Sequence, residues 1–270
     1  MGKYRDLAKL EGSDQGKDIS PTLKIIPIST GRFQTAEKSN FTYGINQGVK
    51  IQAPILMWFI ESPNKRILID TGGGDPDWAA RYHHPLDRKK EEDPINALKD
   101  LGLFPTDIDI IIMTHLHWDH SFNTDLFPNA KVVVQQEEVY YALNPLPCHA
   151  LYYESQLIGM TPPWLKSLNR MEIINGEKEI EPGIRVISLP GHTPGFQGVL
   201  VDLKSGRCMI AGDTIPLWEN WEPNHQGFRT PSGIHTNLFD YYNSFKIIES
   251  ITDRVLPGHD MKVLEKSFYD

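Results

Sequence analysis

The chain has little cysteine, no long apolar run and no excess of positive charge. Its two cysteines, Cys148 and Cys208, are too few for a disulfide framework, which predicts a reducing, cytoplasmic location. No apolar run approaches the roughly 18 residues that cross a bilayer, and the N-terminus lacks the apolar stretch of a secretory signal. The net charge of −8 leaves no broad basic face for phosphates. We therefore expect neither a membrane nor a nucleic acid as a partner.

The chain shows no internal repeat, low-complexity tract or clear linker, which predicts a single domain over residues 1–270. Residues 1–20 are polar and without periodicity, and they are expected to form a loose arm. Two further stretches, 144–170 and 214–238, are rich in aromatic residues and are predicted to be long loops that cover a pocket. The first of them could also serve a contact in a homodimer.

Short strands and helices alternate only in part along the chain. Apolar patterning predicts strands at 23–28, 54–61, 66–70, 108–113, 131–134, 184–189, 196–203, 208–211 and 254–256. Helices are predicted after the cap and Pro of Asp93-Pro94, over 136–143 and 238–250, and near Trp164. Since hairpins are frequent, this mixture indicates sheets packed on each other with helices outside, an α/β (α+β) fold.

The segment His115-Leu-His117-Trp-Asp119-His120 concentrates side chains that bind metals. In an extended segment His115 and His117 point to the same side, so they can reach one cation. Asp119 and His120 follow where the strand has ended and can turn towards a second cation. Three imidazoles and a carboxylate packed so closely would be costly to bury without a cation, so the motif predicts a site for two metals.

Three more donors, His192, Asp213 and His259, stand in similar settings. Each follows an apolar strand and has a glycine directly before it. Glycine lets the backbone bend sharply as the strand ends. Since open α/β sheets place their ligands at strand ends, all these side chains could converge on one edge.

This pattern resembles the metallo-β-lactamase superfamily over about residues 23 to 260, and Asp70 in Leu68-Ile-Asp70-Thr-Gly resembles a further motif of that superfamily. In order and spacing, the N-acyl homoserine lactonase branch is the most similar. The resemblance implies a four-layer αββα sandwich. It also implies one metal ion on His115, His117 and His192, a second on Asp119, His120 and His259, and Asp213 as the bridge between them.

The resemblance further implies two Zn²⁺ ions, although iron or manganese could occupy the same ligands. Asp70 would orient the ligands or merely cap its strand. Two cations would lower the pKa of a bridging water, and the resulting hydroxide would attack a carbonyl carbon. The candidate catalytic residues are Asp119, which could hold or shuttle a proton, Asp213 and His235.

The sequence departs from the lactonases after the bridging Asp213. They carry a Tyr three residues later, thought to contact the substrate carbonyl, whereas this chain has Pro216, which has no side-chain donor. Either another group does that task or the substrate differs. Candidates in the same loop are Trp218, Asn220, Trp221, His225 and His235. The aromatic residues of the two long loops could form an apolar wall for a substrate or simply pack on each other; they are Tyr152, Tyr153, Trp164, Trp218, Trp221 and Phe228.

The leading prediction is thus a dinuclear-metal hydrolase that opens a lactone, an N-acyl homoserine lactone or a related cyclic ester. Its substrate would be a small molecule with an ester or lactone carbonyl. A thioester or cyclic-amide hydrolase of the same fold is the alternative within the enzyme class. From a different class, the chain could be an inactive metal-binding sensor or interaction module.

Overall fold

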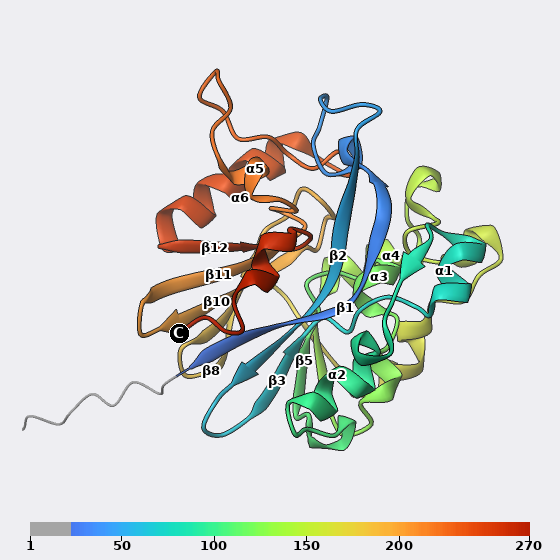
Figure 1. Ribbon diagram of the computed structural model, residues 1–270, viewed down its shortest axis with the longest axis vertical. Helices are drawn as coiled ribbons and strands as arrows, with labels where there is room; N and C mark the ends of the chain where they lie inside the picture. Colours follow the sequence, from blue (N-terminus) through green and yellow to red (C-terminus); the bar gives the residue numbers. More distant parts are fainter. Residues whose placement is uncertain (1–22) are drawn as a thin grey trace, which may run out of the picture.

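The computed structural model describes residues 23–270 as two β-sheets packed face to face, with helices on their outer sides (Figure 1). The predicted arm, residues 1–20, lies outside the described residues. The larger sheet contains, in order across it, β4 (Leu86–Asp87), β1 (Lys24–Glu37), β2 (Lys50–Glu61), β3 (Arg66–Ile69), β5 (Ile110–Ile112), β6 (Lys131–Gln135) and β7 (Met171–Ile174). Its β4-β1-β2-β3 part is antiparallel and its β3-β5-β6-β7 part is parallel.

The smaller sheet contains β12 (Arg254–Pro257), β11 (Gly206–Gly212), β10 (Gln197–Leu203), β9 (Ile184–Ser188) and β8 (Lys178–Glu181), in that order. Only the pair β11 and β12 is parallel, because α6 connects these two strands across the sheet. The other neighbours are antiparallel. Three of the parallel strands, β5, β11 and β12, end at loops that carry candidate ligands.

The α-helices are α1 (Pro76–Tyr82), α2 (Pro94–Asp100), α3 (Trp118–Ser121), α4 (Gln136–Leu143), α5 (Trp218–Trp221) and α6 (Leu238–Ile251). As predicted, Asp93 caps α2: its carboxylate accepts from the backbone N–H of Ile95 and Asn96. Short 3-10 helices occupy η1 (Lys38–Asn40), η2 (Lys90–Glu92), η3 (Pro105–Asp107), η4 (Thr124–Leu126), η5 (Pro147–His149), η6 (Gln156–Ile158), η7 (Pro163–Arg170) and η8 (Met261–Glu265).

The layers are held together by three apolar clusters. Between the sheets, Ile69 and Ile112 of the larger sheet pack with Ile210 and Leu256 of the smaller one. On the outer face of the smaller sheet, α6 packs through Tyr241 and Phe245, among others, on residues such as Met209. A third cluster joins α2 and α4 to the outer face of the larger sheet, where α1 to α4 lie in Figure 1. This arrangement confirms the predicted αββα sandwich.

All the predicted strands and helices are found. Some of them extend further than predicted, and the structure also contains elements that were not predicted. β1 continues to Glu37 and β2 begins at Lys50, since the two pair along most of their length. β8, with sequence Lys-Glu-Ile-Glu, has no apolar alternation because it is an edge strand with few buried side chains. The predicted helix near Trp164 is the 3-10 helix η7.

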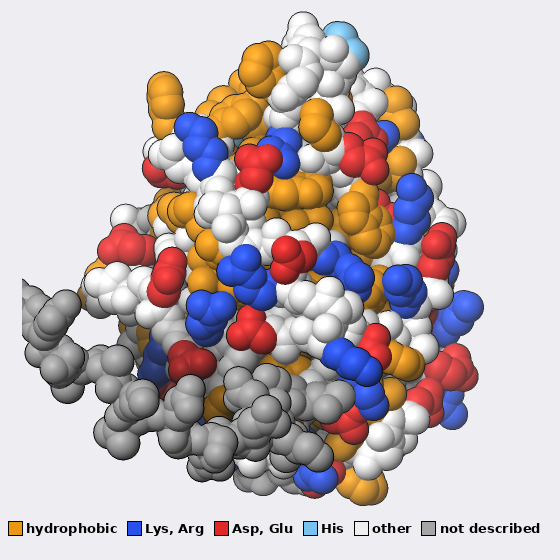
Figure 2. Space-filling view, turned by 90° about the vertical axis from the view of Figure 1, so that its left-hand side faces the viewer, with side chains coloured by type: hydrophobic (Ala, Val, Ile, Leu, Met, Phe, Trp, Pro, Cys, Tyr) orange, Lys and Arg blue, Asp and Glu red, His pale blue; other side chains and the backbone are white. Residues whose placement is uncertain are grey.

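Charged side chains of both signs are interspersed with apolar ones on the face of the molecule shown in Figure 2. Within residues 23–270, no helix is both long and apolar enough to span a bilayer. The 144–170 stretch exposes several apolar side chains, among them Leu146, Leu151, Leu157 and Ile158. The homodimer and the cytoplasmic location stay predictions.

Ile210 of β11 provides a test of the central core. Its side chain is fully buried between the sheets, so Ile210→Ala should lower the free energy of unfolding by about 2–5 kcal/mol. The matched control is Ile173→Ala in β7, where the isoleucine is 47% exposed and its truncation should cost far less. Urea unfolding followed by circular dichroism measures both. Equal losses for the two variants would contradict the assigned core.

Candidate metal centre

Four strands deliver the predicted ligands to one end of the sandwich. β5 leads into His115 and His117, β9 into His192, β11 into Asp213 and β12 into His259. The five imidazoles and Asp213 are buried. The side chain of Asp119, the seventh candidate, is 14% exposed. The seven predicted side chains, although distant along the chain, therefore meet at one place.

The turn of α3 separates the ligands of the His-rich motif into two directions. The backbone N–H groups of His120 and Ser121 donate to the carbonyl of His117 at 3.1 and 3.0 Å, which closes a helical turn. Successive residues of a helix are rotated by about 100° around its axis. Asp119 and His120 consequently project differently from His117, although the ring of His120 stays 4.2 Å from that of His115.

The ligand atoms fall into groups whose members lie within 4.8 Å of one another. One group is His115, His117 and His192, and another is Asp119, His120 and His259. A third, formed by His115, His120 and Asp213, connects the first two. These are the two triads and the shared carboxylate that the sequence predicts.

The carboxylate of Asp213 faces both triads at once. Its Oδ1 lies 3.4 Å from His120 Nε2 and 3.2 Å from His259 Nε2. Its Oδ2 lies 3.4 Å from His192 Nε2. With one oxygen towards each triad, Asp213 has the geometry of a bridging ligand.

Backbone carbonyls fix the orientation of two of the imidazoles. Nδ1 of His192 donates to the carbonyl of Ile234 at 2.8 Å, and Nδ1 of His259 donates to the carbonyl of Pro54 at 2.8 Å. A carbonyl only accepts, so the proton of each ring is on Nδ1 and the lone pair of Nε2 points into the centre. Such outer partners also raise the basicity of a metal-binding imidazole.

Asp70 orients two more imidazoles. It leaves the sheet beside Met113, because Ile69 and Ile112 pair at the ends of β3 and β5. Its Oδ1 accepts from Thr114 N–H at 2.7 Å, and its Oδ2 accepts from the Thr114 hydroxyl and from His120 Nδ1, both at 2.8 Å. The Thr114 oxygen is then free to accept from Nδ1 of His115 at 3.0 Å. Asp70 therefore orients ligands and is more than a strand cap.

The two triads differ in their electrostatics. Burial lowers the pKa of His115 and His117 well below its usual value, and that of His192 to about 4. Burial also opposes protonation of His120 and His259, but the carboxylates, Asp213 first among them, outweigh it and raise their pKa. Neutral imidazoles are the form that binds metals, so the first triad is ready to bind a cation near neutral pH.

Several buried atoms of this centre have no partner within residues 23–270. Nε2 of His115, Nε2 of His120 and Oδ1 of Asp213 make no hydrogen bond there, although all three are shielded from water. Orphaned buried polar atoms are rare in folded proteins. Cations bound by nitrogen and carboxylate ligands would satisfy all three, so the residues fit a pair of metal ions.

Glycine is required where two of the ligand loops turn. Gly212, directly before Asp213, has a φ of 48°, a conformation that few other residues adopt. At Gly258, directly before His259, a Cβ atom would lie 2.8 Å from Oδ1 of Asp213. The predicted strand–glycine–ligand pattern thus serves both the bend and the close approach of the loops.

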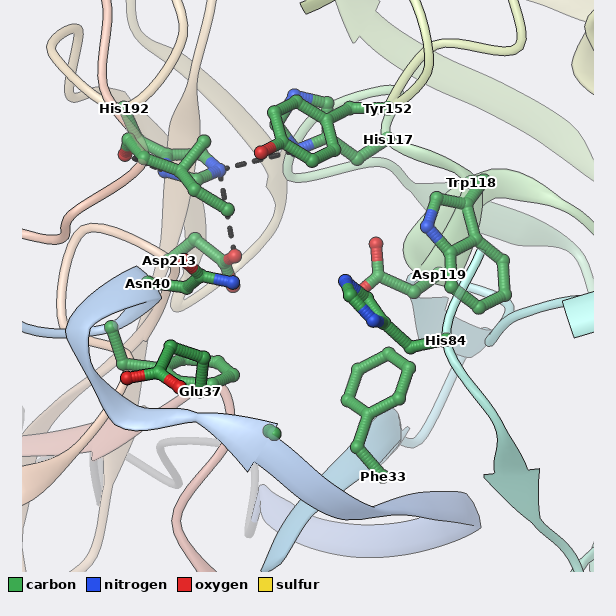
Figure 3. Close-up of a pocket in the computed structure, with 13 residues that line it drawn as sticks. Phe33, Glu37, Asn40, His84, His117, Trp118, Asp119, Tyr152, His192 and Asp213 are labelled. Atoms are coloured by element: carbon green, nitrogen blue, oxygen red, sulfur yellow. Dashed lines mark hydrogen bonds and ion pairs between the residues drawn. The ribbon is translucent and has the colours of Figure 1, made fainter. Parts of the chain in front are cut away.

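A cavity opens above the candidate ligands (Figure 3). It is lined by Phe33, Ala36, Glu37, Asn40, Phe41, His84, His117, Trp118, Asp119, Tyr152, His192, Asp213 and Ile234. The two loops predicted to cover a pocket contribute Tyr152 and Ile234, whereas the segment 33–41 contributes five residues that the sequence did not suggest. Phe33 and its neighbours reach the site because β1 runs on past its predicted end.

Most of the other side chains singled out in the sequence lie outside the cavity lining. His235 is not among the residues that line the cavity; its Nδ1 donates to the Ser232 carbonyl at 2.9 Å, and its ring packs on Tyr43. A catalytic role for His235 stays a prediction. Of the loop aromatics only Tyr152 lines the cavity, while Tyr153 and Trp164 are buried in the outer core.

Comparison with known families settles the relationship. A model of the metallo-beta-lactamase superfamily matches residues 52–259. The chain belongs to this superfamily. An N-acyl homoserine lactonase of a Bacillus species is 32% identical in an alignment of length 255 that covers 88% of this chain and 94% of that relative. The N-acyl homoserine lactonase AttM of Azorhizobium caulinodans is 26% identical in an alignment of length 241 that covers 82% of this chain and 87% of that relative.

Solved structures of the superfamily share the fold. An N-acyl homoserine lactone hydrolase with the product N-hexanoyl-L-homoserine at its catalytic metal centre has a TM-score of 0.73 at 22% identity, over 92% of this chain and 96% of that one. The dizinc quorum-quenching lactonase AidC gives 0.67 at 19% identity, over 90% and 92%. Together with the relatives above, they confirm the predicted superfamily, its lactonase branch and a lactonase-like hydrolase.

Asp70→Asn tests how ligand orientation affects metal binding. Asp70 accepts from three donors, and an amide would present N–H groups to at least one of them. We expect zinc to bind about 10–100-fold more weakly, measured by competition with a chromogenic chelator. Asp109→Asn, which alters a partly exposed carboxylate paired with Lys65 just before β5, is the control and should leave zinc affinity unchanged. Unaltered zinc affinity in Asp70→Asn would rule out the orienting role.

Proposed function

We propose that this chain is a dinuclear metal hydrolase that opens the ring of a lactone, an N-acyl homoserine lactone or a related cyclic ester. The observation that carries the proposal is the pair of ligand triads sharing Asp213 at the base of a cavity. The names of the relatives, which are N-acyl homoserine lactonases, support the class of substrate.

In this proposal His115, His117 and His192 hold one cation, and Asp119, His120 and His259 hold the other, with Asp213 between them. Zinc suits neutral imidazole and carboxylate ligands best, and iron or manganese could take its place. When bound, such a pair lowers the pKa of a shared water towards neutrality and polarises a carbonyl group. Proton transfer and hydrogen bonding to the substrate are assigned to side chains of the protein.

Asp119 is placed to handle a proton. Its Oδ2 lies 3.8 Å from Nε2 of both His120 and His259, and the side chain also lines the cavity. In Figure 3 its carboxylate points into the open space. One oxygen could therefore face a cation while the carboxylate takes up a proton and delivers it to the leaving alkoxide of the opened ring.

Tyr152 can supply the hydrogen-bond donor that Pro216 lacks. Its ring lies 5.3 Å from that of His117, and Figure 3 shows it at the edge of the cavity. Its backbone is fixed, because its carbonyl accepts from the N–H of Trp118 at 2.8 Å. No hydrogen bond joins its hydroxyl to another part of residues 23–270. The phenol is thus available to a substrate carbonyl next to the His117 triad.

The rest of the cavity favours a substrate with a compact apolar part. Phe33, Phe41, Trp118 and Ile234 form apolar walls, and a polar centre at the base of an apolar pocket is the usual form of a small-molecule site. A thioester or a cyclic amide would meet the same walls and the same centre, so these substrates are the alternatives to separate by assay. An inactive sensor would bind metal and ligand without turnover.

Asp119→Asn tests the proposed reaction. An amide neither accepts the proton nor carries the charge, so hydrolysis should fall by a factor on the order of 10²–10⁴. A pH-indicator assay of the zinc-loaded protein on lactones, thioesters and cyclic amides measures it and also separates the alternatives. Asp125→Asn, at a surface ion pair with Lys166, should retain full activity. Turnover that survives in Asp119→Asn would refute the mechanism, and no turnover of any lactone by the unsubstituted protein would refute the function.

Tyr152→Phe removes only the phenolic hydroxyl from the cavity wall. Loss of one donor to a developing oxyanion typically lowers kcat by roughly 10²–10³, and we expect a loss of that size with zinc content unchanged. The matched control is Tyr140→Phe, where the tyrosine is 59% exposed. If kcat and KM for the best lactone are the same in both variants, Tyr152 is not the donor.

A further inference from the structure

Glu138 of α4 is a buried carboxylate that the proposed reaction does not use. Its side chain is fully buried, and it forms no ion pair with a Lys, Arg or His within residues 23–270. Burying a carboxylate without a cationic partner is costly unless hydrogen bonds replace its lost water. The position therefore needs an explanation beyond the packing of an outer helix.

The hydrogen bonds of Glu138 lead to two loops that carry candidate ligands and to Tyr153. Its Oε1 accepts from the backbone N–H of Leu116 at 2.9 Å and from the Tyr153 hydroxyl at 2.9 Å. Its Oε2 accepts from the hydroxyl of Thr193 at 2.5 Å. The backbone N–H of Gly195 also donates to this carboxylate. All of these groups are donors, so the position requires a side chain that only accepts.

Both loops carry ligands of the same triad. Leu116 stands between His115 and His117, and Thr193 directly follows His192. One oxygen of Glu138 is thus tied to the first ligand loop and the other oxygen to the second. The two loops also approach α4 closely, since a Cβ at Gly195 would lie 2.0 Å from the backbone nitrogen of Glu138.

The second triad is supported in another way. His120 is oriented by Asp70, and His259 by the carbonyl of Pro54. Neither of these partners is bonded to Glu138. Asp70 also reaches the first triad, because the Thr114 hydroxyl that donates to it accepts from His115, so the support from Asp70 is shared and the support from Glu138 is not.

We propose that Glu138 is a positioning residue that sets the spacing between the His115–His117 segment and His192, and thereby the metal affinity of that triad alone. The proposal rests on the two-metal site proposed above. Since Glu138 contacts neither the cavity nor a ligand side chain, it acts through Leu116 and Thr193. Loss of its carboxylate should weaken one metal position and leave the other unchanged.

The test measures zinc binding with each triad examined by itself. His259→Ala leaves the triad of His115, His117 and His192, and His192→Ala leaves the other one. Into each background Glu138→Gln is introduced, and the affinity for Zn²⁺ alone is measured by competition with a chromogenic chelator. We expect Glu138→Gln to weaken zinc about 10–100-fold in His259→Ala and less than about twofold in His192→Ala. Asp70→Asn should instead weaken zinc in both backgrounds, because Asp70 supports His120 directly and His115 through Thr114.

Glu137→Gln is the matched control, because Glu137 is the exposed neighbour on the same helix. Circular dichroism shows whether Glu138→Gln folds. If it does not, the same measurements are made on Thr193→Val, which deletes a single donor to Glu138. Equal weakening in both backgrounds, or none in His259→Ala, would overturn the positioning role. Fewer than two equivalents of zinc in the unsubstituted protein would instead refute the two-metal proposal itself.

Discussion

The carboxylate of Asp213 is buried between two sets of imidazoles, and a buried carboxylate is stable only beside positive charge or hydrogen-bond donors. Its oxygens face His120 and His259 on one side and His192 on the other. Protons can supply this charge only on the side of His120 and His259, where neighbouring carboxylates raise the pKa of the rings, since burial keeps His192 neutral. A cation on each side would satisfy both oxygens, and the strand ends, tight turns and outer hydrogen bonds bring the candidate donors to this one carboxylate.

Most of the fold could be predicted because its core strands are strongly apolar and its turns are short. The run from Ile110 to Ile112 is buried on both faces, and the hairpins β2–β3 and β10–β11 connect neighbours in sequence. The edge strand β8 was not predicted, because an edge strand needs few apolar residues and shows little apolar alternation. The extension of β1 to Glu37 was not predicted because it depends on pairing with β2 and not on local composition.

The candidate ligands could be predicted because few residue types bind metals and their spacing is restrictive. The cavity wall could not, because Phe33 and Asn40 come from a segment with no chemical signature, and it reaches the cavity because β1 extends further than its local sequence suggests. Pro216 shows that the loop after Asp213 lacks a side-chain hydrogen-bond donor at this position. Only the folded chain shows that Tyr152, distant in sequence, lines the cavity.

The imidazoles are oriented by two kinds of hydrogen-bond partner, main-chain carbonyls and a side-chain carboxylate. A mutation can remove only the second kind. His192 and His259 donate to the main-chain carbonyls of Ile234 and Pro54, which every amino-acid replacement at those positions retains. His120 depends on the Asp70 side chain, which a single codon change can delete. Genetic drift can therefore retune this centre through side-chain supports such as Asp70, but not through the two main-chain carbonyls.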